Sequence, residues 1–209
     1  MRGFMTKNSQ VDVVYDQLRA KILDGTLAQG DDLNERAIAD LTGTSRTPVR
    51  EGVARLIEDG LAERQNRRTR VTVWDEERLG QLYETRALLE SEACRLAAMR
   101  RSENTIIRLE ASLAEQQGLK NPSSELRRDL NYRFHEEIWQ ASGNPFLLEA
   151  NRKYGVQSMS VTPTTLRTDE RWEKSIEEHT ELVRHIDAHR AAEAADLMRQ
   201  HLESALRQR

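Results

Sequence analysis

Residues 39–63 constrain the fold of this 209-residue chain more than any other stretch. Apolar residues recur three or four positions apart on both sides of an interruption at Thr42-Gly43-Thr44, which predicts two helices joined by a tight turn. Ser45 can cap the second helix, and Pro48 suits its first turn, where a missing N–H costs nothing. This arrangement is typical of a helix-turn-helix, in which the start of the second helix meets the edges of DNA bases.

The segments on either side of this stretch complete a small domain. Helical periodicity at residues 11–23 predicts a further helix, and Asn34 can cap the first helix of the helix-turn-helix. Gly60 ends its second helix, and two short β segments follow, one on each side of residues 65–69. Three helices and a β-hairpin, or wing, predict a winged helix-turn-helix over residues 1–74, of which the first ten are polar and expected to fray.

Charge is distributed unevenly along the chain. The formal net charge of −3 alone argues against a nucleic-acid partner. Residues 45–74, however, hold seven arginines and four acids, a local balance of +3. The basic excess therefore lies in the predicted helix-turn-helix and wing, while the acidic remainder suits a body that faces solvent or a small ligand.

Two runs in this domain, Leu33-Asn34-Glu35-Arg36 and Ser45-Arg46-Thr47-Pro48-Val49-Arg50-Glu51, resemble the DNA-binding domain of GntR-type bacterial transcription regulators. The resemblance implies double-stranded DNA as a partner. The contacts that it implies are Arg36, Thr44, Ser45, Arg46, Thr47 and Arg50. The arginines are the expected base readers, because a guanidinium can pair bidentately with guanine. Arg68 stands where the family commonly has a wing glycine, so Arg67 and Arg68 are expected to contact phosphates or the minor groove through their side chains.

From Asp75 onward the periodicity is helical almost without interruption. Breaks near Gly118 and Pro145, and a linker expected around residues 162–168, divide this part into about six helices. Charged residues make up 32% of the chain and aromatic residues only 5%, which favours long charged helices over sheets. The predicted fold is mostly α, with a helical bundle over residues 75–209 after the winged domain.

The composition also indicates the cellular compartment in which the protein is expected. The single Cys94 excludes a disulfide framework within the chain, and no run of apolar residues is long enough to cross a membrane. No secretory signal is visible at the start of the sequence. A cytoplasmic protein without a membrane partner is therefore expected.

Three histidines fall on inward-facing positions of three different predicted helices: His135, His179 and His201. Three imidazoles that converge in an apolar bundle suggest a divalent metal such as zinc, although any one of them alone is more often an ordinary core or surface histidine than a ligand. Asn131 lies one turn before His135 on the same face and can add an oxygen ligand. Asp129 projects from the far side of that helix and is a poorer candidate.

Residues of this bundle resemble the FCD ligand-binding domain of the FadR-like branch of GntR regulators, over roughly residues 78–207. The resemblance is carried by Tyr83, Arg86, Glu90, Asn131, Phe134, His135, Glu178, His179, Met198 and His201. It implies a divalent metal ion, zinc first with nickel or manganese as alternatives, held by Asn131, His135, His179 and His201. Asn131 replaces the usual Asp and carries no charge, so weaker metal binding is expected.

A metal held in this way leaves coordination positions for a small carboxylic-acid effector. Arg86 is the expected effector-binding residue, since it could form a forked pair with another carboxylate oxygen. The alternative is an ion pair between Arg86 and Glu90, four residues further on. His185 and His189 match no ligand of the family and are expected to be solvated.

The sequence as a whole predicts a transcriptional regulator, with repression relieved by effector as the expected mode of action. A homodimer is expected, because a two-fold protein matches a palindromic operator. Two alternatives remain open. One is a metal-dependent, hydrolase-like enzyme with Glu136 or Glu178 as general base, which leaves the DNA-binding domain unexplained. The other is a structural metal bundle that binds no effector.

Overall fold

The structure, a computed structural model, describes residues 9–161 and 164–208. It divides into two compact units, one formed by residues up to Trp74 together with Ser160 and Val161, the other by the rest of the described chain. The expectation that the N-terminus frays concerns residues that lie mostly outside the described part. Ser9, the first described residue, already caps a helix through a reciprocal capping box with Asp12.

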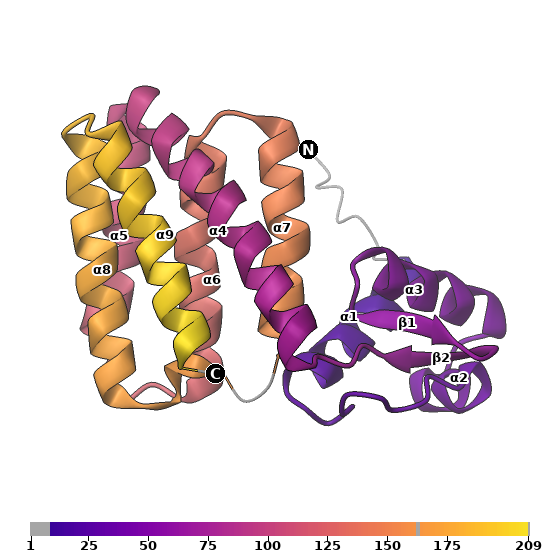
Figure 1. Ribbon diagram of the computed structural model, residues 1–209. Helices are drawn as coiled ribbons and strands as arrows, with labels where there is room; N and C mark the ends of the chain where they lie inside the picture. The colour runs from indigo at the N-terminus through magenta and orange to yellow at the C-terminus, as the bar shows by residue number, and fades with distance from the viewer. Residues whose placement is uncertain (1–8, 162–163, 209) are drawn as a thin grey trace, which may run out of the picture. The chain divides into compact units, whose positions relative to one another are not determined.

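The first unit consists of three helices and a two-stranded hairpin (Figure 1). Its elements are α1 (Gln10–Leu23), α2 (Glu35–Thr42), α3 (Arg46–Glu58), β1 (Ala62–Gln65) and β2 (Arg68–Val71). Asn34 caps α2, since its Oδ1 accepts the N–H groups of Arg36 and Ala37 at 3.0 and 3.2 Å. Gly43, with φ of 64°, ends α2 in the left-handed conformation that glycine favours. The predicted winged helix-turn-helix is confirmed.

Apolar side chains of α1 and α3 form the core of this unit. Val14 and Val49 are fully buried, and Leu61 closes the core where the chain leaves α3 for the wing. Ser45 occupies the cap position of α3 as predicted, but its hydroxyl makes no capping hydrogen bond. The reason is local: Pro48, three residues on, has no N–H to donate.

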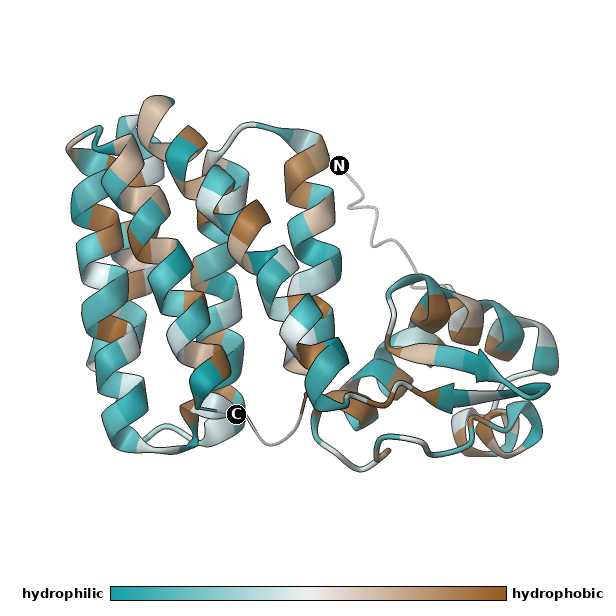
Figure 2. Ribbon diagram, viewed as in Figure 1, coloured by the Kyte–Doolittle hydropathy of each residue, from teal (hydrophilic) through white to brown (hydrophobic). Residues whose placement is uncertain are grey.

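The second unit is a bundle of long helices that pack side by side (Figure 1). Its elements are α4 (Glu76–Met99), α5 (Glu103–Gly118), α6 (Ser124–Ala141), α7 (Pro145–Met159), the short 3-10 helix η1 (Thr165–Arg167), α8 (Asp169–Asp187) and α9 (Ala191–Arg207). Figure 2 shows that these helices carry hydrophobic and hydrophilic residues side by side, as amphipathic helices do. The six predicted helices are confirmed, and η1 occupies part of the expected linker, of which residues 162–163 are not described.

The core of the bundle is formed by Phe134, Ile138, Leu182 and Ile186, which are fully buried between α4, α5 and α9. A second cluster packs Trp139 of α6 between α4 and α7. In the described part of the chain, no helix has both the length and the apolar character needed to cross a membrane.

Candidate metal centre and nucleic-acid interface

The three histidines predicted as ligands meet inside the bundle, each from a different helix. His135 lies on α6, His179 on α8 and His201 on α9, and all three are buried. Each offers a nitrogen atom, and these atoms all lie within 4.8 Å of one another. The sequence therefore placed these three side chains correctly on inward faces, and the bundle brings them to a single point.

The Nδ1 atom of every one of these rings is held by an oxygen of a side chain. Nδ1 of His135 lies 2.6 Å from Oε2 of Glu90, and Nδ1 of His201 lies 2.6 Å from Oε2 of Glu178. Nδ1 of His179 lies 3.0 Å from Oε1 of Gln116. Carboxylate oxygens only accept, so Nδ1 of His135 and His201 carries a proton, and in the neutral form of these rings Nε2 is the nitrogen with the lone pair.

This arrangement fits a metal ion. Histidine ligands of metals commonly donate their second ring N–H to a carboxylate or carbonyl oxygen, which fixes the tautomer and the orientation of the ring. Nε2 of His135 is buried and has no hydrogen-bond partner among the described residues. A divalent cation held by the three imidazoles would occupy this nitrogen of His135, so the donor set suits zinc and similar ions.

Two buried arginines hold the carboxylates in turn. Nε and Nη2 of Arg86 lie 2.9 and 2.8 Å from Oε1 of Glu90, which leaves Oε2 for His135. Trp139 Nε1 donates to the same Oε2 at 3.0 Å. On the other side of the centre, Nη1 of Arg171 donates to Oε2 of Glu178 at 3.0 Å. Arg86 thus makes the ion pair that was the alternative to effector binding.

The pKa values follow from burial and these contacts. Burial alone would raise the pKa of Glu90, but the charge of Arg86 and the hydrogen bonds from His135 and Trp139 outweigh it and lower the pKa to about 2. Burial lowers the pKa of His201 to about 4, although Glu178 opposes the change. Burial also lowers the pKa of His179 to well below its usual value. Glu90 is therefore ionised and these two imidazoles are neutral at neutral pH.

Asn131, the predicted oxygen ligand, lies half-buried beside the centre. Its Oδ1 accepts a hydrogen bond from Ser175 Oγ at 3.3 Å, and the same hydroxyl lies 3.5 Å from Nε2 of His179. Asn131 and His179 thus share one neighbour. Asp129 instead pairs with Arg128 and is half-exposed, as its position on the far side of the helix predicted.

Part of this centre is not evident from the sequence. Gln116 gave no signal, because it lies 63 residues from His179 in the chain and at the end of a different helix. Ser175 could have been noticed one turn before His179 on the same face of α8. His189 is not simply solvated, because its Nδ1 lies 3.0 Å from the carbonyl oxygen of Ala98.

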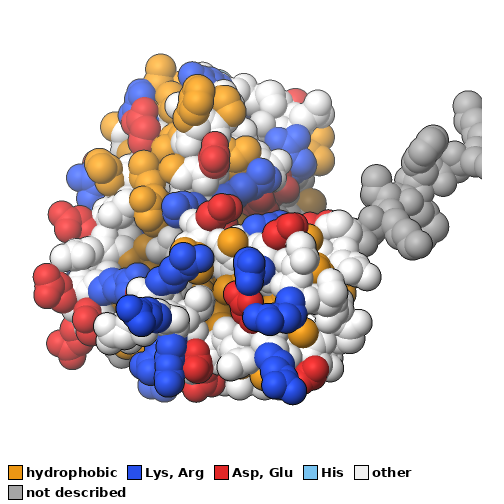
Figure 3. All heavy atoms as spheres, turned by 90° about the vertical axis from the view of Figure 1, so that its right-hand side faces the viewer, with side chains coloured by type: hydrophobic (Ala, Val, Ile, Leu, Met, Phe, Trp, Pro, Cys, Tyr) orange, Lys and Arg blue, Asp and Glu red, His pale blue; other side chains and the backbone are white. Residues whose placement is uncertain are grey.

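The residues predicted to contact DNA lie on three neighbouring features of the first unit: the start of α2, the first turn of α3 with the loop before it, and the tip of the wing. The residues are Arg36, Thr44, Ser45, Arg46, Thr47, Arg50, Arg67 and Arg68. All are exposed except Thr44, which is half-buried and shares a hydrogen bond with Thr42. Lys and Arg side chains, with acidic ones between them, are prominent on the lower part of the face in Figure 3.

The recognition arginines are only loosely held in the free protein. The side chains of Arg46 and Arg50 are 71% and 70% exposed, and both lie near Glu35, at 3.8 and 3.6 Å. Exposed pairs at such distances contribute little, so both guanidinium groups are available to another partner. Arg68 lies 3.7 Å from Asp32 in the same manner.

The tip of the wing is a tight turn. Positive φ angles fall on Asn66 and Arg67, at 50° and 67°, rather than on Arg68. Since Gln65 pairs with Arg68, these two residues form the two-residue turn of the hairpin, in which both central residues need positive φ. Arg68 belongs to β2, and it is Arg67 that occupies a backbone conformation favouring glycine.

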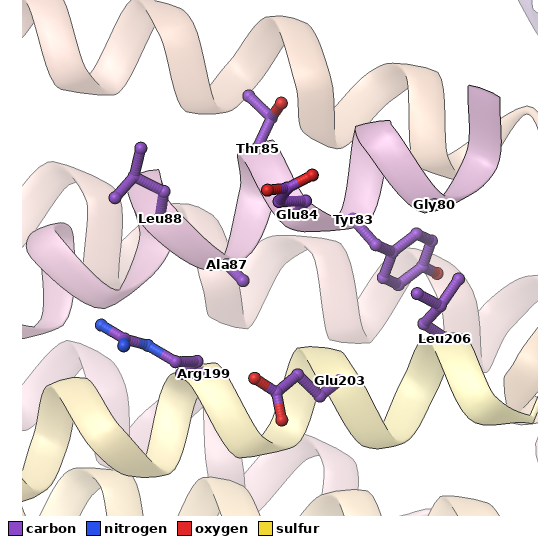
Figure 4. Close-up of a pocket in the computed structure, with 9 residues that line it drawn as sticks. All are labelled: Gly80, Tyr83, Glu84, Thr85, Ala87, Leu88, Arg199, Glu203 and Leu206. Carbon is purple, nitrogen blue, oxygen red and sulfur yellow. The ribbon is translucent and has the colours of Figure 1, made fainter. Parts of the chain in front are cut away.

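A surface pocket of about 520 Å³ lies between α4 and α9 (Figure 4). Leu88, Tyr83 and Leu206 give it an apolar lining, while Glu84, Arg199 and Glu203 supply charge. Leu88 is 69% exposed. The pocket contains none of the three histidines, so it is separate from the candidate metal centre.

Comparisons with known proteins agree with both halves of this description. Residues 10–71 match the family described as bacterial regulatory proteins, gntR family, and residues 81–204 match the FCD domain. The chain is 33% identical over 140 residues to the uncharacterized HTH-type transcriptional regulator YdhC of Bacillus subtilis, covering 64% of this chain and 61% of that protein. It is 33% identical over 158 residues to the Glc operon transcriptional activator of Escherichia coli (strain K12), covering 66% and 62%.

These matches span about three fifths of the length of both relatives. Among solved structures, E. coli McbR/YncC has a TM-score of 0.76 at 22% identity and covers 94% of each chain, which is a likeness of fold. Taken with the winged helix-turn-helix and the three-histidine bundle, the matches show that the chain belongs to the GntR family of transcriptional regulators, with an N-terminal GntR helix-turn-helix and a C-terminal FCD domain of the FadR-like kind.

Proposed function

We propose that this protein is a cytoplasmic repressor that binds a palindromic DNA operator as a homodimer and responds to a small carboxylic acid bound at a metal centre in its helical bundle. The observation that carries the proposal is the pairing, in one chain, of an exposed arginine-bearing recognition helix with three converging histidines whose Nδ1 atoms are all engaged. Because the GntR family consists of transcription regulators rather than enzymes, the hydrolase alternative is dropped.

For DNA binding, we assign base reading to Arg46 and Arg50 and backbone contacts to the wing. Both arginines project from the N-terminal part of α3, Arg46 at its first position and Arg50 at its fifth, which is the part of a recognition helix that reaches base edges. Arg67 and Arg68 lie at the wing tip, where a guanidinium can meet phosphates. Thr44, Ser45 and Thr47 offer hydroxyl groups beside the start of α3, and Arg36 extends the surface from α2.

For the metal, we assign His135, His179, His201 and Asn131 as ligands of a divalent ion, with zinc first and nickel or manganese as alternatives. When bound, the ion supplies a cation that can accept a carboxylate oxygen of the effector. Glu90, Gln116 and Glu178 hold the three rings in the orientation that this requires. For Arg86 we propose support of Glu90 rather than direct effector contact, because two of its nitrogens are committed to Oε1 in a buried pair.

Operator selection from random duplex DNA, followed by affinity measurements at fixed salt, tests the DNA-binding part. Arg50→Ala should weaken binding to the selected site by about 1–3 kcal/mol and relax specificity at one position of each half-site. Arg68→Ala should weaken binding to all sequences alike and flatten its salt dependence. Arg184→Ala, which removes an exposed arginine from the bundle, is the control and should change neither.

Three outcomes would count against the proposal. Equal operator affinity for the wild type and Arg50→Ala would remove the base-reading assignment. A reporter gene is placed behind the selected operator. If its expression rises when the protein is produced, the protein is an activator and not a repressor. A protein that holds metal and binds no carboxylic acid would leave the structural metal bundle as the better account.

A further inference from the structure

The ligands assigned to the metal carry no charge. A histidine binds a metal through the unprotonated nitrogen of a neutral ring, and the Nδ1 atoms of His135, His179 and His201 all face side-chain oxygens, which leaves Nε2 as the uncharged donor of each ring. Asn131 is an amide. A divalent ion held by these four donors would keep its full charge of +2.

The surrounding charged groups cancel in pairs. Arg86 is paired with Glu90, and Arg171 with Glu178. These four side chains, which support the histidine ligands, therefore carry no net charge. The other acids near His135 on α6 are also paired, outside the centre: Glu136 with Arg152 at 2.7 Å and Glu137 with Arg108 at 2.9 Å. Each of these four carboxylates of the described chain is thus already compensated by an arginine.

One further feature favours an anion at this place. Arg171 is 4% exposed, and its Nε is buried without a hydrogen-bond acceptor among the described residues. Arg171 lies on the same face of α8 as Ser175 and His179, at four-residue spacing. A buried guanidinium N–H without an acceptor is costly, so a second anionic oxygen in this region would be stabilised.

A buried charge of +2 is unfavourable unless an anion compensates it. We propose that, with a divalent ion bound, this centre selects a small dianionic chelating acid over a monoanionic acid of the same shape, because Asn131 leaves the ligand set uncharged. The inference rests on the proposed metal centre and names the class of effector that it takes. An aspartate at this position would supply one negative charge and reduce the need for a second on the ligand.

Oxalate and glycolate make a matched pair of probes, since both form a five-membered chelate ring and they differ by one charge. The affinity of each is measured on the cobalt-loaded protein by calorimetry and by the visible spectrum of the ion. The ratio of the two affinities is then compared between the wild type, Asn131→Asp, Glu178→Gln and a control, Gln140→Glu, which adds a charge at an exposed position of α6. Any intrinsic preference of free cobalt for oxalate cancels in this comparison.

Asn131→Asp should lower the oxalate-to-glycolate ratio by at least about tenfold, since one elementary charge acts at close range in a poorly solvated site. Glu178→Gln keeps the shape of the side chain, leaves Arg171 uncompensated, and should raise the ratio. Gln140→Glu should leave it unchanged. A mere loss of packing would not move the two site variants in opposite directions.

An unchanged ratio in Asn131→Asp overturns the inference, and so does failure of metal-loaded wild type to bind either acid. If Asn131→Asp does not fold, the Glu178→Gln variant tests the inference instead: an oxalate-to-glycolate ratio that rises supports it, and one that falls or stays the same overturns it. Metal content after gel filtration is measured for every sample. A wild type that takes up no metal refutes the metal centre itself, an outcome distinct from a loaded protein that does not discriminate between the acids.

Discussion

Glu90 connects more groups of the candidate metal centre than any other described residue. Its two carboxylate oxygens accept from Arg86 on one side and from His135 and Trp139 on the other, and all four side chains are buried. A buried charge is tolerated only when it is paired and hydrogen-bonded, and Glu90 meets both conditions. The residue is therefore needed for the stability of the bundle as well as for the orientation of His135.

Glu90→Ala should destabilise the protein by about 3–5 kcal/mol, because it leaves the guanidinium of Arg86 buried without its partner. It should also weaken metal binding roughly 10- to 100-fold, since His135 loses the acceptor that orients it. Denaturant unfolding of the metal-free protein and competition with a metal chelator measure the two effects. Glu92→Ala, which breaks a half-exposed pair with Arg95 on the same helix, is the control and should cost about 1 kcal/mol at most. Equal losses in the two variants would contradict the role given to Glu90.

Gly155 of α7 allows this helix to pack closely against α6. A Cβ atom there would lie 2.5 Å from Cη2 of Trp139 and 3.0 Å from Cε2 of Tyr132, two ring atoms that cannot both move away easily. Gly155→Ala should therefore cost about 1–3 kcal/mol, the usual penalty for overpacking a core. Gly80→Ala, at a position of α4 with no described atom within 4 Å, should instead stabilise by about 0.5–1 kcal/mol, and thermal unfolding of the two variants checks the opposite signs.

At the scale of whole elements, helix ends were predictable from sequence because their causes are local. Asn34 caps α2 and Ser102 caps α5 through their own side chains, and Pro145 begins α7 directly after a glycine turn. The inward faces of His135 and His179 followed in the same way from helical periodicity.

What the sequence could not supply depends on contacts between distant segments. The oxygen partners of the histidines come from α4, α5 and α8, and only the packing of the bundle brings them to the imidazoles. The resemblance places the wing glycine at Arg68, whereas the turn lies at Asn66 and Arg67, because the register between β1 and β2 sets Gln65 opposite Arg68.

The wing turn allows stability and DNA affinity to be separated. Arg67 has φ of 67°, which costs a non-glycine residue roughly 1 kcal/mol, so Arg67→Gly should stabilise the first unit by up to about that amount. The same change removes a charge from the wing and should weaken DNA binding across all sequences, with a smaller salt dependence. Thermal unfolding measures the stability, and binding to operator and to random duplex measures the DNA affinity. Arg64→Gly, at a position within β1, is the control and should lose stability. A less stable Arg67→Gly would contradict the strain assigned to the turn.

For the whole molecule, the proposal assigns the two sites to different units. The arginines of α3 and the wing belong to the first, and the three histidines to the second. An effector can change the affinity for DNA only if it binds two states of the protein with different affinities. The same coupling then acts in both directions, so operator DNA must change the affinity for the effector by the same factor.

The measurement that tests this account most directly is a titration of the metal-loaded protein with an acid that alters operator binding, with and without saturating operator duplex. Operator DNA is predicted to change the affinity for the acid, and the acid to change the affinity for operator DNA, by the same factor. This factor is on the order of 5- to 150-fold. His179→Ala should abolish both shifts while operator binding without acid is retained. An affinity for the acid that is the same with and without operator, or a full response in His179→Ala, would contradict the claim that the histidine centre controls DNA binding.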